Sequence, residues 1–132
     1  MRAEDHWEKA QHLEHSRLRR LDPNADYELV IWSCIHGGAQ LLNVILHHTG
    51  VTADDFDMIH TSVPESTFHI PDTHKPVFEA LARIEALGPR FVRGAETWDV
   101  DVGRRCLADY AIVKAAAASS IANSQPAVGR AQ

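Results

Sequence analysis

The segment from Asp26 to Gly50 constrains the fold most, because its apolar side chains cover more than half of a helical wheel. A helix that is apolar over so wide an arc must be contacted from several sides. We therefore predict that this second helix lies at the centre of a helical bundle. Gly37 and Gly38 lie within or beside the arc, where glycine costs about 1 kcal/mol relative to alanine. The pair indicates close approach of a neighbouring helix. The apolar positions are Val30, Ile31, Cys34, Ile35, Leu41, Leu42, Val44, Ile45 and Leu46.

Apolar residues at helical spacing predict further helices over about 3–20, 53–60, 74–87 and 102–122, so the fold is an all-α bundle of about five helices. The helix over 53–60 has the clearest start signal. Thr52 to Asp55 has the form of a capping box, and Val51 and Phe56 occupy the two staple positions.

The helix ends carry their own signals. Asp26 and Asp101 are predicted N-caps, Gly50 is a predicted C′ residue, and Gly88–Pro89 is a predicted helix stop. Residues 61–71 read as a loop, whereas the connection over 90–100 is apolar enough to pack across the bundle. A chain of 132 residues is one domain by size, with a helical bundle over 1–122 and a flexible tail over 123–132.

Composition narrows the classes of function. A net charge of -5 gives little counterion release on nucleic acid, so broad DNA or RNA binding is not expected. No membrane span is expected, because polar residues and glycines interrupt the charge-free stretch over 29–53. Without a signal-peptide pattern the predicted location is the cytoplasm. Cys34 and Cys106 are then read as reduced core thiols.

A polar stripe on the predicted central helix is the best candidate site. His36, Gln40, Asn43 and His47 fall within an arc of about 60° and include no charged residue of the kind that solvated stripes carry. Imidazole and amide groups both donate and accept hydrogen bonds, so the stripe suits an internal cleft that binds a ligand. The alternative is a satisfied polar seam or the narrow exposed edge of a buried helix.

Other groupings of polar residues give weaker signals. Arg90 and Arg93, with Arg104 and Arg105 nearby, are candidates to hold a phosphate or carboxylate. No metal, cofactor or catalytic residue is predicted. A helical group at the N-terminus has ligand spacing but lies opposite the apolar face, and a loop group cannot be assembled without the fold. The first comprises Asp5, Glu8, His12 and His15, and the second His60, His69, His74, Asp57, Glu65 and Asp72.

One family resemblance follows from the layout of the chain. A first helix with Trp7 and Ala10 is followed by Tyr27 to Gly50, which ends in Leu41-Leu42-Asn43-Val44-Ile45-Leu46-His47-His48-Thr49-Gly50. This layout, with Ile84 to Arg93 before a long final helix, resembles the HEPN superfamily. The resemblance implies a helical bundle that dimerises and that acts as a ribonuclease, binds nucleotides or partners a nucleotidyltransferase. Active HEPN ribonucleases carry an Arg followed, after four to six residues, by a His. No such spacing occurs here, so the resemblance carries over no catalytic residue.

We therefore predict a non-catalytic module that binds a protein partner or a small ligand or nucleotide, as a homodimer. One alternative is a His-dependent hydrolase or HEPN-type ribonuclease that uses His36 and His47 of the polar stripe as acid and base. A second alternative is a metal-binding bundle.

Overall fold

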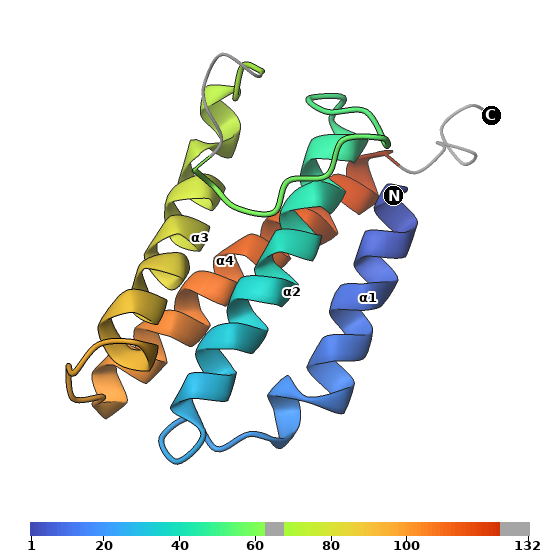
Figure 1. The fold of residues 1–132 in the computed structure, drawn as a ribbon. Helices are drawn as coiled ribbons and strands as arrows, with labels where there is room; N and C mark the ends of the chain where they lie inside the picture. Colours follow the sequence, from blue (N-terminus) through green and yellow to red (C-terminus); the bar gives the residue numbers. More distant parts are fainter. Residues whose placement is uncertain (63–67, 125–132) are drawn as a thin grey trace.

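The computed structural model describes residues 1–62 and 68–124, which form a bundle of helices (Figure 1). The α-helices are α1 (Ala3–Ser16), α2 (Tyr27–His48), α3 (Lys75–Leu87) and α4 (Val100–Ser124). Short 3-10 helices cover Leu18–Arg20 and Asp72–His74, and a π-helical turn covers Gly88–Val92. The described part of the chain contains no strand, so the predicted all-α class is confirmed.

Helix α2 is the centre of the bundle and packs against α1, α3 and α4. A Cβ atom on Gly37 would lie 2.7 Å from the hydroxyl oxygen of Tyr110 on α4. A Cβ atom on Gly38 would lie 2.6 Å from Cδ1 of Leu81 on α3. Both glycines therefore admit a side chain from a neighbouring helix, and the predictions of a central helix and of close approach at the glycines are confirmed.

The helix predicted over 53–60 is wrong, because these residues form turns and irregular chain in place of a helix. The Thr52 hydroxyl lies 2.9 Å from Nδ1 of His47. Phe56 packs edge-on against Phe68, with ring centroids 5.8 Å apart. The residues that the local pattern assigned to the cap and the staple are thus engaged by other parts of the chain. Among the described residues the bundle has four α-helices.

The end of α2 follows the sequence signal. Gly50 has φ +76, and its N–H donates to the His47 carbonyl at 3.3 Å. The N–H of Val51 donates to the Leu46 carbonyl at 2.9 Å, which completes a Schellman motif. This turn reverses the chain after His47, so the loop that follows runs back along the helix. The predicted C′ glycine is confirmed.

One of the two predicted N-caps is confirmed. Asp26 occupies the N-cap position of α2, although its carboxylate accepts a hydrogen bond from the Asp22 N–H at 2.9 Å and makes no capping bond to α2. At α4 the capping residue is Asp99 and not Asp101. The Asp99 carboxylate accepts hydrogen bonds from the N–H groups of Asp101 at 2.8 Å and Val102 at 3.0 Å.

The predicted stop at Gly88–Pro89 is confirmed for the α-helix, because α3 ends at Leu87, and a π-helical turn follows it directly. The Arg93 N–H closes this turn on the Gly88 carbonyl at 3.0 Å. Pro89 has no N–H, which removes one α-helical hydrogen bond and leaves room for the wider turn. The connection that follows does pack across the bundle as predicted, since the Trp98 indole donates to the Pro23 carbonyl at 3.1 Å.

A buried polar contact joins α1 to α4. Glu14 is buried, and its carboxylate accepts a hydrogen bond from the Tyr110 hydroxyl at 3.0 Å. The same carboxylate pairs with the Lys114 ammonium at 2.5 Å. Burial, and then the nearby Glu14 carboxylate, raise the pKa of the Tyr110 hydroxyl.

Within the described ranges, α2 is the one helix long and apolar enough to cross a membrane, judged by length and composition. Of its most apolar stretch, 67% is buried inside the bundle, and core helices pass the same test. Helix α4 runs to Ser124, two residues beyond the predicted end. The rest of the predicted tail, residues 125–132, lies outside the described residues.

Candidate functional site

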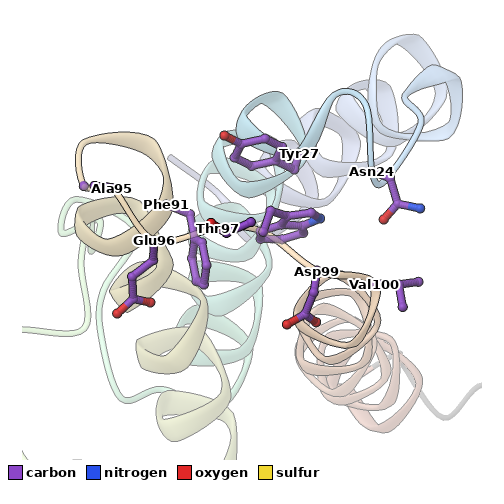
Figure 2. A pocket seen from close by; sticks show the side chains of 10 residues that line it. Asn24, Tyr27, Phe91, Ala95, Glu96, Thr97, Asp99 and Val100 are labelled. Carbon is purple, nitrogen blue, oxygen red and sulfur yellow. The ribbon is translucent and has the colours of Figure 1, made fainter.

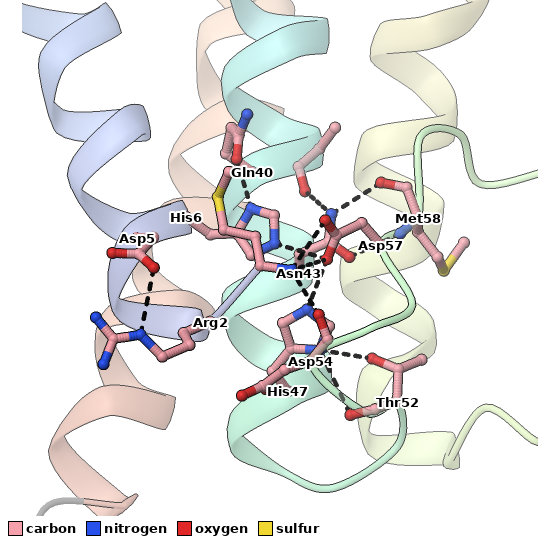
Figure 3. A network of polar contacts seen from close by, with 12 residues as sticks. Arg2, Asp5, His6, Gln40, Asn43, His47, Thr52, Asp54, Asp57 and Met58 are labelled. Atoms are coloured by element: carbon pink, nitrogen blue, oxygen red, sulfur yellow. Dashed lines mark hydrogen bonds and ion pairs between the residues drawn. The ribbon is translucent and has the colours of Figure 1, made fainter.

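Three side chains from separate parts of the chain converge at one end of the bundle (Figure 3). Nε2 of His6 on α1 and Nε2 of His47 on α2 each lie 2.9 Å from the same oxygen, Oδ1 of Asp57. Asp57 belongs to the loop that follows α2. The two imidazole rings are 5.3 Å apart between centroids. We call these three residues the His6–His47–Asp57 cluster.

Burial differs sharply within the cluster. The side chain of His6 is 4% exposed and that of His47 is 1% exposed, whereas Asp57 is 38% exposed. Helix α1 turns Ala3, His6 and Ala10 toward α2, and antiparallel packing brings its first turn beside the last turn of α2. Two imidazoles are therefore held rigidly in the protein, and the carboxylate meets them from the solvent side.

The second nitrogen of each ring has its own polar partner. Nδ1 of His6 lies 2.6 Å from Oε1 of Gln40. Nδ1 of His47 lies 2.9 Å from the Thr52 hydroxyl and 3.4 Å from the Thr52 carbonyl oxygen. Oε1 of Gln40 can accept a hydrogen bond from Nδ1 of His6, and the Thr52 hydroxyl can donate a hydrogen bond to Nδ1 of His47 or accept one from it. On the other side of each ring, Nε2 can donate a hydrogen bond to the carboxylate oxygen of Asp57.

Asn43 fixes the loop that carries Asp57. Its Oδ1 accepts from the Met58 N–H at 2.8 Å, and its Nδ2 donates to the Met58 carbonyl at 2.8 Å. Nδ2 also donates to the Ala39 carbonyl at 3.0 Å. Because Met58 directly follows Asp57, this two-way clamp holds the carboxylate over the imidazoles.

The electrostatics of Asp57 reflect its neighbours. Partial burial raises its pKa, but hydrogen bonds with His6, His47 and the Met1 amino group outweigh this effect and lower the pKa to about 2. The Met1 nitrogen lies 3.3 Å from both carboxylate oxygens. Asp57 is therefore an anion at neutral pH. Two imidazoles and an anionic carboxylate can exchange protons, orient a polar ligand or hold a cation.

A cavity of about 340 Å³ adjoins the cluster, between α1, α2 and the loop after α2. Polar groups of the cluster form one part of its wall, and apolar side chains form another. Trp32 and His36 stand edge to face at its rim, with ring centroids 5.6 Å apart. The lining residues are Met1, His6, Trp32, Ile35, His36, Ala39, Gln40, Asn43, Asp57, Met58, Ile59 and His60.

The predicted polar stripe divides between different roles. His36 is exposed at the cavity rim, Gln40 bonds to His6, Asn43 clamps Met58, and His47 belongs to the cluster. His36 and His47 are eleven residues apart on α2, which is about 16 Å along the helix. This separation is too large for the two to act together on one bond, as the hydrolase alternative requires.

Arg90 and Arg93 lie elsewhere, on and just after the π-helical turn. That turn contacts the first part of α2, and the 20 residues from Tyr27 to His47 span about 30 Å of helix. Arg90 pairs with Glu96 at 2.7 Å and stacks over Phe91 at 5.0 Å. The structure therefore does not bring the two arginines to the cavity.

The other sequence groupings do not assemble into one site. On α1, Glu8, His12 and His15 are exposed. In the loop group, Asp57 joins the cluster, His60 faces Glu85 at 3.6 Å, and His74 bonds to Thr49 at 3.1 Å. Glu65 lies outside the described residues.

The connection between α3 and α4 and the start of α2 enclose a larger depression of about 640 Å³ (Figure 2). Tyr27 and Trp98 stack here with ring centroids 5.1 Å apart. Its acidic residues have structural partners, since Glu96 pairs with Arg90 and Asp99 caps α4. No set of titratable side chains converges in this depression among the described residues, so the smaller cavity is the better candidate site.

Both cysteines lie in the core, as predicted, and are not part of the cluster. A hydrogen bond with Cys106, followed by burial, raises the pKa of the Cys34 thiol. Cys34 is therefore a protonated core residue rather than a nucleophile.

Sequence reasoning missed His6 and left Asp57 in a predicted helix. A signal for His6 was present, because Ala3, His6, Ala10 and Glu14 share one helical face and are all buried. No local signal places Asp57. A scan against protein-family models and searches of curated proteins and solved structures found no match to this chain. The functional inference therefore rests on its own residues.

Proposed function

We propose that this protein is a non-catalytic module that binds a small molecule in the cavity beside the His6–His47–Asp57 cluster. The observation that carries the proposal is the mixed lining of that cavity. Trp32, Ile35 and Ile59 provide apolar contact, and Gln40 provides a polar group at the wall. An apolar pocket with a few convergent polar groups is the usual form of a ligand site.

The size of the cavity narrows the ligand class. A volume of about 340 Å³ is near the lower end of the range of about 300–1,000 Å³ for small-molecule sites. It suits a molecule with one ring better than a nucleotide. His36 and His60 at the cavity can donate hydrogen bonds to a polar acceptor on such a ligand.

The test uses ¹⁵N-labelled protein and four probes: benzoate, phenol, nicotinamide and adenosine. We expect a single-ring probe to shift the amide signals of Ala39 and Ile59 and the indole signal of Trp32 in a saturable way. The shifts should be smaller or absent with adenosine. If no single-ring probe saturates these signals, the proposal fails.

A cavity-filling substitution provides the matched control. Ala39 lines the cavity, and the change Ala39→Phe should block it. Ala82 is exposed on α3, so Ala82→Phe makes the same change away from the cavity. Binding lost in the first variant and kept in the second supports the site. Equal binding in both would contradict it.

A homodimer formed through one edge of α2 is a second candidate property. Leu29 is 51% exposed and Trp32 is 45% exposed, three residues apart on the same helix. Exposed apolar residues that share a helical face favour association. Sedimentation analysis should show a dimer that Leu29→Glu dissociates and that Ile112→Glu, at an exposed site on α4, leaves intact. A monomeric wild type would contradict this candidate.

The resemblance to HEPN proteins stays a prediction. Its expected dimer is the association just described, and the missing Arg–His spacing agrees with a binding role rather than a ribonuclease role. A helical bundle alone does not favour it, because this architecture serves many unrelated functions.

A further inference from the structure

We propose that His6, His47 and Asp57 form a binding site for one divalent first-row transition metal ion of the Zn²⁺ type. The candidate ligand atoms are two imidazole Nε2 atoms and a carboxylate oxygen, which all lie within 4.8 Å of one another. This inference does not depend on ligand binding in the cavity. It concerns residues other than the exposed helical group that the sequence had suggested.

The donor set matches known zinc chemistry. Two His and one carboxylate, with a remaining open position, form a recurring catalytic type of zinc site. Tetrahedral coordination at about 2.0–2.1 Å places donor atoms about 3.3 Å apart. Each Nε2 lies 2.9 Å from Oδ1, so an ion requires the carboxylate to withdraw by a few tenths of an ångström. Asp57 is the exposed member of the cluster and lies on a loop, which makes this adjustment easy.

The partners of the imidazole rings are those that metal ligands have. A metal-bound imidazole almost always donates its other N–H to an oxygen, which fixes the ring and its tautomer. Nδ1 of His6 lies 2.6 Å from Oε1 of Gln40, and Nδ1 of His47 lies 2.9 Å from the Thr52 hydroxyl oxygen. Both Nε2 atoms are therefore presented to the same point before any ion arrives.

The position of the three groups also suits a cation. Nε2 of His6 and Nε2 of His47 both point at the same carboxylate oxygen, and both imidazole side chains are almost fully buried, at 4% and 1% exposed. One divalent ion between them would be bound by both nitrogens and by the oxygen, and its binding would displace any proton on Nε2.

The cavity lies against His6 and Asp57, so an open coordination position on that side would face it. A cavity ligand with an oxygen or nitrogen donor could then complete the coordination shell. Such a ligand would bind more tightly to the metal-loaded protein than to the metal-free protein.

The test is a calorimetric titration of the metal-free 132-residue protein with ZnCl₂, followed by Co²⁺ absorption spectroscopy. The protein needs a C-terminal tag free of histidine and no N-terminal extension, because the Met1 amino group contacts Asp57. We expect one equivalent of Zn²⁺ to bind. We also expect Co²⁺ to give the intense visible bands of a four- or five-coordinate site.

Variants separate the site from adventitious binding. His47→Ala and Asp57→Ala should each weaken Zn²⁺ binding by at least about 100-fold, and Gln40→Leu by about 10- to 100-fold. The double variant His12→Ala/His15→Ala removes two exposed imidazoles on α1 and should bind Zn²⁺ as the wild type does. Asp57→Ala keeps the test valid if a histidine variant fails to fold, since Asp57 is exposed.

The outcomes divide cleanly. Loss in the cluster variants with retention in the α1 double variant supports the site. No stoichiometric uptake by the wild type, full binding in Asp57→Ala, or loss in the α1 double variant would each overturn it. Ala39→Phe should leave Zn²⁺ stoichiometry at one while blocking cavity ligands. Failure of the cavity proposal can therefore be told apart from failure of the metal site.

Discussion

Asn43 offers the sharpest test of how the site is built, because its side chain alone ties the loop to α2 at Met58. The change Asn43→Ala removes a donor and an acceptor at once. It leaves the N–H and the carbonyl of Met58, a residue that is 3% exposed, without their partners. We expect a clear loss of stability together with release of Asp57 from the imidazoles.

The size of the stability loss follows from the two backbone groups of Met58 that lose their hydrogen bonds. An unsatisfied buried polar group costs about 1–3 kcal/mol, so two such groups cost about 2–6 kcal/mol. The loop lies near the surface, and a small displacement would let water reach Met58. We therefore expect the lower part of that range, about 2–4 kcal/mol, in the free energy of unfolding.

Urea denaturation measures this change, and hydrogen exchange at the Met58 amide reports the loop itself. Ser33→Ala is the matched control. Ser33 is also a buried polar residue on α2, but its hydroxyl has no hydrogen-bond partner among the described residues. Its removal should alter stability by less than about 0.5 kcal/mol. A difference below about 1 kcal/mol between the two variants, with Met58 still protected, would refute the clamp.

Three further predictions concern the core and the helix ends. The Tyr110 phenol keeps its proton in the folded state above the ordinary value of 10.0, so stability should fall as pH rises beyond about 10. In wild type, Tyr110 should lower the free energy of unfolding by up to about 1.4 kcal/mol for each pH unit above 10. Urea melts of Tyr110→Phe should show a decrease with pH that is smaller by this amount, and an unchanged decrease would contradict the burial argument. Gly37→Ala should lower the free energy of unfolding by about 1–2 kcal/mol in urea melts, because the new Cβ would lie 2.7 Å from the Tyr110 hydroxyl. Gly88→Ala has open space at its Cβ and should raise the free energy of unfolding by about 0.4–1 kcal/mol. Gly50→Ala should cost about 1–2 kcal/mol by the same measure because φ is +76, and a neutral result would argue against the Schellman turn.

Part of the candidate site could be predicted from the helical periodicity of the sequence, and part could not. Helical periodicity placed Gln40, Asn43 and His47 on one stripe of α2, and the structure gives each of them a contact that shapes the cluster or its loop. The cluster itself depends on His6 and Asp57. His6 meets His47 only through the register of α1 against α2, which no local signal encodes. Asp57 meets them because Asn43 holds the loop.

The helix that was predicted over 53–60 did not form, because tertiary hydrogen bonds outweighed a local signal. Thr52 to Asp55 satisfied the capping rules, but a capping box is worth only about 1 kcal/mol. The Thr52 hydroxyl instead bonds to His47, and Met58 bonds to Asn43. These tertiary hydrogen bonds compete directly with a short helix that has little apolar surface to bury.

Helical spacing of apolar residues was enough to predict an all-α bundle, the wide apolar arc of α2 its central place, and the glycine after α2 the turn at Gly50, because each signal lies in residues that are close together in the sequence. Only the tertiary structure decided which polar side chains meet. The facing of α1 and α2 brings His6 to Asp57, which is 51 residues away in the chain, and the hydrogen bonds between Asn43 and Met58 set the path of the loop that carries Asp57.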